Sequence, residues 1–523
     1  MKIVEKIKNW FRRGGLAVGM GQEYGSILDH PKINMDENEH RRIIDNLRIY
    51  RGDHPAVRYL NSKGNWKERP LMSLNMMKEV ADTLASVVFN EKCKIDIADP
   101  QAHEFITQVF EDNNFIENFA EYLEPMFAVG GLGVRPYIDT KDYSVKFSWA
   151  QANTFYPLHS NTNEIKECAI ATVTTKVENK EKVYYTLLEF HEWENDVYVI
   201  TNELYKSDKQ TSLGKQVPLS HLYEDLQERT EIHRVTRPVF NYLKPAGFNN
   251  ISPHSPLGLS VVDNAKNTLT QIDTSNDQFY WEVKMGQRKV AVSSEMTKVR
   301  MDREGNPVTV FDDESNVFLA LRGEMSETFI KDLTNDIRAK DYIDSINHFF
   351  RILEMQTKLS TGTFNFDGVS VQKTATEVVS ENSQTYKTRN KHLVNVEKFL
   401  KELIVSILEL SSATINKEGR AVYLGTIPSF DDIGINFDDG VFTDKTTKLE
   451  HYSQAVDARF MPRREAIQRA MDVSEETAQE WILQMRREQI QFDPEYRNRI
   501  IPTALFGRDE LNRLNEGSDN ETD

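Results

Sequence analysis

The chain has 523 residues, of which 39% are hydrophobic and 28% charged, and its formal net charge is −17. This length exceeds what one compact core accommodates, so we expect a folded, soluble protein of roughly three or four subdomains. The acidic balance excludes an ordinary duplex-binding protein, which needs cationic side chains to neutralise phosphates, and no apolar run is long enough to span a membrane.

The only cysteines, Cys93 and Cys168, stand far apart and form no CxxC pair. A disulfide framework and a thiolate zinc site are therefore not expected, and a reducing compartment fits. The first residues, Met1 to Lys6, lack the apolar core of a signal peptide.

The N-terminal part of the chain predicts several helices. Residues 2–13 form a basic amphipathic pattern, either a membrane-surface anchor or, the favoured interpretation, an arm packing on a neighbouring subunit. Helical periodicity follows over residues 36–50, 73–90 and 101–128. The glycine-rich residues 128–134 are followed by no Lys-Ser/Thr pair, so we expect a tight helix-to-strand turn and not a phosphate loop.

Residues 134–243 are rich in β-branched and aromatic residues and predict a meandering sheet. Strands are expected at 145–147, 169–173, 183–188 and 197–200, with turns at 178–180 and 194–196. His191, Glu192 and Glu194 have the chemistry of metal ligands, but alternation on two strand faces explains them more simply.

The middle of the chain predicts a helix, a small β unit and a second helix. The first helix begins near Val262 and ends at Met285-Gly286. Strands at 289–292, 308–311 and 317–321 surround a turn at 302–307, and helical periodicity returns over 329–353. The polar face of this second helix suits either packing beside copies of itself along a wet channel or an ordinary surface position; its residues are Lys331, Arg338, Asp341, Asp344 and Ser345.

A glycine-bounded loop then leads into a very long helix. Phe364 and Phe366 lie in this loop, where they either fold into a pocket or project into a lumen. Thr374-Ala375-Thr376-Glu377 fits a capping box, and the helix continues without Gly or Pro to Leu410, about 55 Å at ~1.5 Å per residue. Because only its second half carries an apolar stripe, we expect it to pack along half its length.

Three features resemble the portal proteins of tailed bacteriophages, in the SPP1-like family of Gram-positive phages. The first is Thr374 to Val378 followed by the polar run Asn382 to Tyr386. The second is the order helix, β unit, helix, loop, long helix. The third is the pair of helical segments from Met461 to Glu488.

The resemblance implies an α+β, multi-domain portal architecture of wing, stem, clip and crown, with long helices and a small β clip, assembling into a ring. The domains it implies are an N-terminal arm (1–34), wing (35–258), first stem helix (259–286), clip (287–325), second stem helix (326–358), tunnel loop (359–372), long helix with wing strands (373–442), helical crown (443–514) and a disordered tail (515–523).

The resemblance also implies a mechanical function and no enzyme activity or cofactor. Portals form a dodecameric ring at one capsid vertex of the virion, assembled in the host cytoplasm. The ring nucleates procapsid assembly with major capsid and scaffolding proteins, docks the terminase large subunit, and binds head-completion connector proteins. Double-stranded DNA passes through it without sequence specificity, and no membrane is involved.

Three sets of residues are expected to serve this function. The tunnel loop facing DNA comprises Thr361, Gly362, Thr363, Phe364, Asn365, Phe366 and Gly368. The stem face on the channel comprises Lys331, Arg338, Asp341 and Ser345. The clip turn that docks the motor and connector comprises Arg303, Glu304, Gly305 and Asn306.

Two other functions stay open at this point. Asp431, Asp432, Asp438, Asp439 and Asp444 offer paired carboxylates for a metal-dependent nuclease. No His or Lys accompanies them, so solvated strand ends of a wing sheet are the favoured interpretation. A non-ring scaffold of the capsid is the other alternative, and the strand-rich residues 134–243 argue against a mostly helical rod.

Overall fold

The computed structural model describes residues 23–60, 64–89, 93–161, 164–286, 290–293, 298–301, 307–310, 318–321, 330–332, 336–365, 383–437, 445–471 and 473–492. The chain divides into two compact units, Met1–Asp438 and Asp439–Asp523. The expected N-terminal helix, the capping box and the acidic tail lie outside the described residues.

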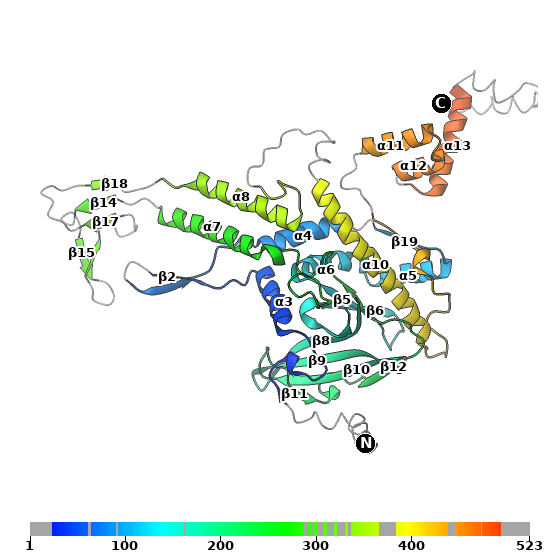
Figure 1. Cartoon of the computed structure of the whole chain (residues 1–523), viewed down its shortest axis with the longest axis horizontal. Helices are drawn as coiled ribbons and strands as arrows, with labels where there is room; N and C mark the ends of the chain where they lie inside the picture. The colour runs from blue at the N-terminus through cyan, green and yellow to red at the C-terminus, as the bar shows by residue number, and fades with distance from the viewer. Residues whose placement is uncertain are drawn as a thin grey trace, which may run out of the picture. The chain divides into compact units, whose positions relative to one another are not determined.

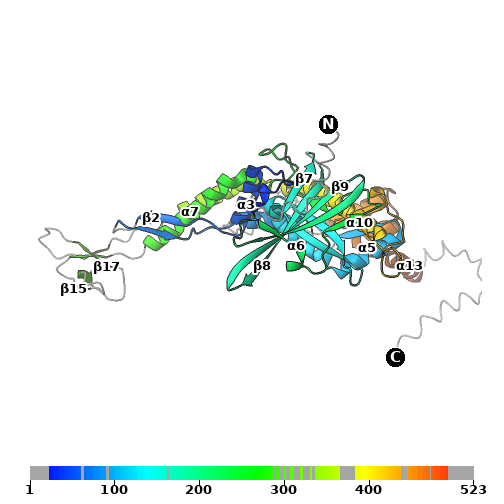
Figure 2. The ribbon, with the colours of Figure 1, turned by 90° about the horizontal axis from the view of Figure 1, so that it is seen from below.

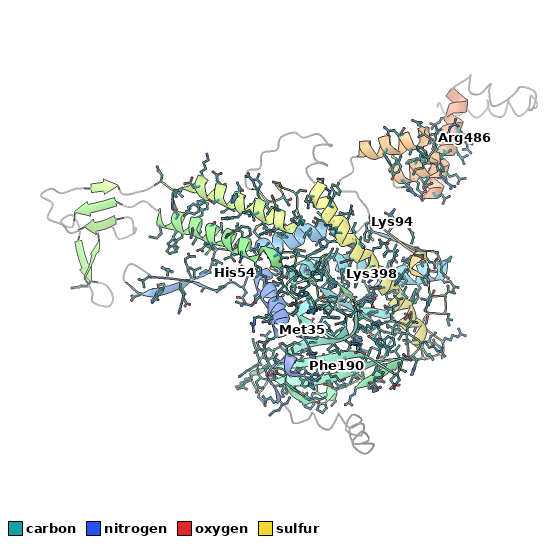
Figure 3. All side chains as sticks on the ribbon, viewed as in Figure 1. Met35, His54, Lys94, Phe190, Lys398 and Arg486 are labelled. Atoms are coloured by element: carbon teal, nitrogen blue, oxygen red, sulfur yellow. The ribbon has the colours of Figure 1, made fainter. Side chains whose placement is uncertain are left out.

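The first unit contains a large antiparallel sheet in the order β1-β11-β10-β9-β8-β7, with β12 beside β10 (Figure 1). Its strands are β1 (Glu23–Tyr24), β7 (Phe155–Ser160), β8 (Ile165–Glu178), β9 (Glu181–Glu194), β10 (Val197–Ser207), β11 (Gly214–Val217) and β12 (Arg229–Ile232). Figure 2 shows β7, β8 and β9 as a twisted fan, and Phe190 marks the sheet in Figure 3.

The two turns predicted in this sheet are confirmed. Asn179 and Lys180 join β8 to β9 with φ of 50° and 71°, and Asn195 and Asp196 join β9 to β10 with φ of 48° and 63°. Two consecutive left-handed residues match the right-handed twist of the flanking strands, and Asn and Asp tolerate that conformation.

The N-terminal helices of the core beside this sheet are α3 (Glu37–Tyr50), α4 (Met76–Val88), α5 (Pro100–Asp112) and α6 (Phe115–Val129). The predictions over 36–50 and 73–90 are confirmed, but the single helix over 101–128 is wrong. Asn114 adopts φ 45° and divides that stretch into α5 and α6. Gly130, at φ 103°, ends α6 and β5 begins at Leu132, so the expected helix-to-strand turn is confirmed.

Small sheets complete the core and its surroundings. They are the three-stranded sheet β13 (Asn241–Leu243), β5 (Leu132–Ile138) and β6 (Val145–Gln151), and the pairs β4 (Lys94–Ile97) with β19 (Ile433–Asn436) and β2 (Val57–Leu60) with β3 (Trp66–Arg69).

The helix, β unit, helix order of the middle of the chain is present, with one correction. α7 (Lys266–Met285) ends before Gly286 as predicted, and α8 spans Ala339–Thr357. Between them lie β14 (Val290–Ser293), β15 (Lys298–Met301), β16 (Pro307–Val310), β17 (Phe318–Leu321) and β18 (Ile330–Asp332). The expected helical periodicity is wrong at Ile330–Asp332, because these residues pair with β14 as a strand; backbone pairing overrides the helical spacing.

The long helix α10 is described over Ser383–Ala413, and Lys398 marks it in Figure 3. The second unit contains three helices in its described part: α11 (Lys445–Asp457), α12 (Arg463–Met471) and α13 (Glu475–Phe492).

Candidate functional site: a helical pair and its anchored loop

The pair α7 and α8 is fastened by side-chain contacts near both of its ends. Close to the core, Thr268 donates to Gln356 at 2.8 Å. Towards the β unit, Phe279 stacks on Tyr342 with ring centroids 5.3 Å apart. Beyond them, Arg338 donates to both carboxylate oxygens of Glu282 at 3.2 and 2.7 Å. The pair is therefore held as one stiff element.

The guanidinium of Arg338 also sets the charge of this end of the pair. Its hydrogen bonds lower the pKa of the Glu282 carboxyl to about 2. The carboxylate therefore stays ionised at neutral pH, where it pairs with the guanidinium between the two helices.

The structure separates the residues expected on the face of the second helix. Arg338, Asp341 and Ser345 are exposed, Arg338 immediately before α8 and the other two in its first two turns. Lys331 lies in strand β18 and not on the helix. The expectation that these four share one helical face is therefore wrong for Lys331.

The loop that follows α8 is held by a buried carboxylate. Glu354 is 0% exposed. Its Oε2 accepts from the backbone N–H of Gly362 at 2.9 Å, and its Oε1 accepts from that of Phe364 at 2.7 Å. Burial raises the pKa of this carboxyl, and the amide hydrogen bonds oppose the rise. The first residues of the loop are thereby fixed through their main chain.

A second anchor joins the loop to the described start of α10. The Ser360 N–H donates to the Thr385 hydroxyl at 2.8 Å, and the Thr385 N–H donates to the Ser360 hydroxyl at 3.1 Å. Thr388 donates to the carbonyl of Lys358 at 2.7 Å. Lys358 adopts φ 62° and reverses the chain at the end of α8. The ends of α8 and α10 are thus joined through polar contacts.

The sequence left open whether Phe364 folds into a pocket or projects into a lumen, and the structure places it against the core. It is half-buried and packs against the core, with its ring 6.3 Å from that of Phe350. Thr361, Gly362, Thr363 and Asn365 are exposed. Phe366 and Gly368 lie outside the described residues, as do the clip-turn residues, Arg303, Glu304, Gly305 and Asn306.

The expectation that α10 packs along only half its length is wrong. Thr385, Thr388, Arg389 and His392 in its first half are buried. Arg389 donates to the carbonyl of Val87 at 2.8 Å. The Nδ1 of His392 accepts from the N–H of Ala246 at 3.0 Å, and burial lowers the pKa of His392 to about 4. Polar side chains with specific partners replace the missing apolar stripe.

Glu354 and Ser360 are residues that anchor the loop and that sequence reasoning missed. A signal for Glu354 was present, because it stands beside Leu353 on the buried side of the helix, four residues after Phe350. An ionisable group in such a position needs partners. Its partners are backbone amides eight and ten residues further along. A pattern of side chains in the sequence does not predict such main-chain partners.

The acidic cluster proposed for a nuclease is only partly described. Asp432 accepts from the N–H and hydroxyl of Ser429 at 3.0 and 2.7 Å, and these bonds lower the pKa of its carboxyl. Asp431 is exposed, and Asp438, Asp439 and Asp444 lie outside the described residues. Within the described ranges, no three His, Cys, Asp or Glu side chains come together as a metal site would require.

The other candidate metal ligands form internal contacts. His191 is fully buried, with Nε2 2.6 Å from Glu189 and Nδ1 2.9 Å from the Tyr198 hydroxyl. Glu192 pairs with Lys32 at 2.6 Å, and Glu194 pairs with Arg229 at 2.9 Å.

Comparison with known families identifies the family of the chain. The family model described as "Phage portal protein, SPP1 Gp6-like" matches residues 29–491. The chain belongs to this family of phage portal proteins. The portal family is structural and not catalytic. No helix in the described part of this portal protein has the length and apolar character to cross a bilayer.

Two further comparisons complete the picture. A solved structure entitled "Virion of native gene transfer agent (GTA) particle" is similar to this portal protein with a TM-score of 0.38 and 10% identity, covering 87% of this chain and 97% of that one. No curated protein sequence matches.

Proposed function

We propose that this portal protein forms a dodecameric ring at one vertex of the capsid and is the channel for packaging and ejection of double-stranded DNA. The match of the portal family model to residues 29–491 carries the proposal. The succession of α7, the β unit, α8, the anchored loop and α10 supports it, because a stiff helical pair that ends in a short loop suits the wall of a channel.

The loop after α8 is the proposed contact with DNA. Its residues are Thr361, Gly362, Thr363, Phe364, Asn365, Phe366 and Gly368. Glu354 fixes the main chain as far as Phe364. Within this loop Phe364 therefore acts as a packed base, and the contact made by the described residues is left to its exposed neighbours Thr361, Gly362, Thr363 and Asn365.

The exposed edge of α8 with Arg338, Asp341 and Ser345 is the proposed channel wall. The segment Arg303 to Asn306 connects β15 and β16, which pair as neighbouring antiparallel strands, and we propose it as the docking point for terminase and connector proteins. Lys331 belongs to the same β unit and joins this second role.

The charge of the chain favours passage over binding. Twelve copies at −17 each give the ring a strongly acidic character, and a surface that neutralises few phosphates releases few counterions and holds DNA weakly. The capsid, scaffolding and terminase proteins are the proposed partners, since energy for DNA movement has to come from a motor docked on the ring.

Electron microscopy of the purified protein tests the ring directly. We expect particles with a central hole and cyclic symmetry, and particles without either would overturn the proposal. Packaging assays test the loop: Gly368→Pro is expected to leave the rings intact and reduce the amount of DNA packaged. Normal packaging by this variant would remove the loop from the mechanism without affecting the ring.

A further inference from the structure

The hairpin β2–β3 has two different faces. In its register Leu60 lies opposite Trp66, and Arg58 lies opposite Glu68. These four side chains share one face, because side chains alternate along a strand. Leu60 is 56% exposed and Trp66 is 71% exposed. Val57, Tyr59 and Arg69, on the other face, are half-buried. The outer face thus presents an apolar pair beside an ion pair.

The inner face fastens the hairpin to α7. Arg69 donates to both oxygens of Asp277 at 2.5 and 2.7 Å, and its guanidinium lies 4.7 Å from the ring of Trp281. The ring of Tyr59 lies 5.1 Å from the same indole. A two-stranded hairpin alone is marginally stable in water, so these contacts hold it, and its outer face, in one orientation.

The hairpin and α8 pack on opposite sides of α7. Thr268, Phe279 and Glu282 contact α8. At about 100° per residue, Asp277 and Trp281, which contact the hairpin, fall on the opposite side of the helix. Figure 1 shows the hairpin on one side of α7 and α8 on the other, and the segment with His54 leads into the hairpin in Figure 3. The layers are therefore hairpin, α7 and α8.

The free side of α8 carries matching groups. Lys340 and Asp344 are exposed and one turn apart, on the side of the helix away from Tyr342. Neither forms an ion pair within the described part of the chain. Ile337, immediately before the helix, is 40% exposed, and the rest of its side chain lies beside Gly286 at the end of α7. This surface again combines an apolar side chain with one cation and one carboxylate.

We propose that the outer face of the hairpin in one subunit binds the free side of α8 in a second copy of this chain. Leu60 and Trp66 cover Ile337, Arg58 meets Asp344, and Glu68 meets Lys340. Because the two surfaces lie on opposite sides of α7, the contact is head-to-tail, and such contacts close into rings when the rotation allows. This inference rests on the proposed ring and names part of its interface.

The arrangement leaves the channel edge of α8 free. Arg338, Asp341 and Ser345 lie on the other edge of the exposed side, away from Lys340 and Asp344, when positions are spaced by about 100°. One helix therefore serves the neighbouring subunit on one edge and the lumen on the other.

Disulfide trapping tests the contact. In a Cys93→Ser background we expect the pair Leu60→Cys and Ile337→Cys to give, on oxidation, a ladder of covalently joined subunits that reductant reverses. Non-reducing gels distinguish the two possible products, because a link within one subunit stays at the position of the monomer whereas a link between subunits gives the ladder. The matched control pairs Ile337→Cys with Val177→Cys, at a strand position that is 71% exposed, and is expected to give no ladder.

Truncation of the anchor residue gives a second measurement. Trp66→Ser is expected to raise the protein concentration needed for rings at least about tenfold, as removal of a central interface aromatic does. Phe248→Ser, at an aromatic that is 70% exposed, is the control and should leave assembly unchanged. Wild-type rings with no ladder from the Leu60/Ile337 pair would overturn this contact alone, whereas the absence of wild-type rings would overturn the proposed function.

Discussion

The hairpin β2–β3 and the loop after α8 both carry an aromatic residue, but they are fastened in opposite ways. The hairpin is held through side chains, with Arg69 on Asp277, and leaves Trp66 exposed. The loop is held through main-chain amides, with Gly362 and Phe364 on Glu354, and packs Phe364 inwards. Main-chain fastening leaves loop side chains free to vary, whereas the hairpin depends on particular residues.

Removing the Glu354 carboxylate, which anchors the loop, is expected to have the largest effect on stability. Glu354→Ala removes the acceptor of the Gly362 and Phe364 N–H groups and leaves a cavity where the fully buried carboxylate stood, and we expect the free energy of unfolding to fall by about 3 kcal/mol. Glu354→Gln keeps one acceptor oxygen and should cost about half as much. Hydrogen exchange should locate the loss at the amides of Gly362 and Phe364; unchanged protection there would contradict the anchor.

Breaking the hairpin anchor is expected to have an effect nearly as large. Arg69→Ala strands the largely buried Asp277 carboxylate, whose pKa the guanidinium lowers. We expect a loss of about 3 kcal/mol in the free energy of unfolding and faster exchange across β2 and β3. Asp277→Asn should restore much of the loss. The control is Arg58→Ala, in an exposed pair with Glu68, where such pairs contribute below about 1 kcal/mol; an equal effect at both arginines would contradict the difference.

His392 extends the comparison to α10, because it too is fixed by a main-chain N–H. Its pKa is lowered to about 4 from the ordinary 6.5, so the unfolded chain takes up the proton first as the pH falls. The stability contributed by the neutral imidazole is complete above pH ~6.5 and is lost between there and pH ~4, by about 2 kcal/mol at pH ~5. His392→Gln should remove this part of the pH dependence in denaturant titrations. An unaltered pH profile would show that the imidazole is not buried.

The sequence predicted the elements that have local side-chain signals, and it did not predict contacts whose partners lie far away along the chain. β8, β9 and β10 were predictable because β-branched residues and Asn-Lys or Asn-Asp turns are local signals. α10 was predictable as a helix, but the burial of its first half was not. Burial was inferred from the spacing of apolar residues, and the buried residues there, such as Thr385 and His392, are polar. Arg69 and Asp277 meet across 208 residues, and only the tertiary fold joins them. Ile330–Asp332 was misassigned because its partner strand β14 lies far away in sequence.

The smallest expected effects compare the two aromatic residues within a single subunit. Phe364→Ala removes a half-buried ring from the core next to Phe350 and should lower the free energy of unfolding by about 1.5 kcal/mol. Trp66→Ser removes a ring that is 71% exposed and should change it by less than about 0.5 kcal/mol. Both are measured by denaturant unfolding at concentrations below ring assembly. In assembly the order reverses, because the exposed indole is the one available to another subunit. A Trp66→Ser subunit as unstable as Phe364→Ala would mean that the indole supports its own chain and is not held out for a neighbour.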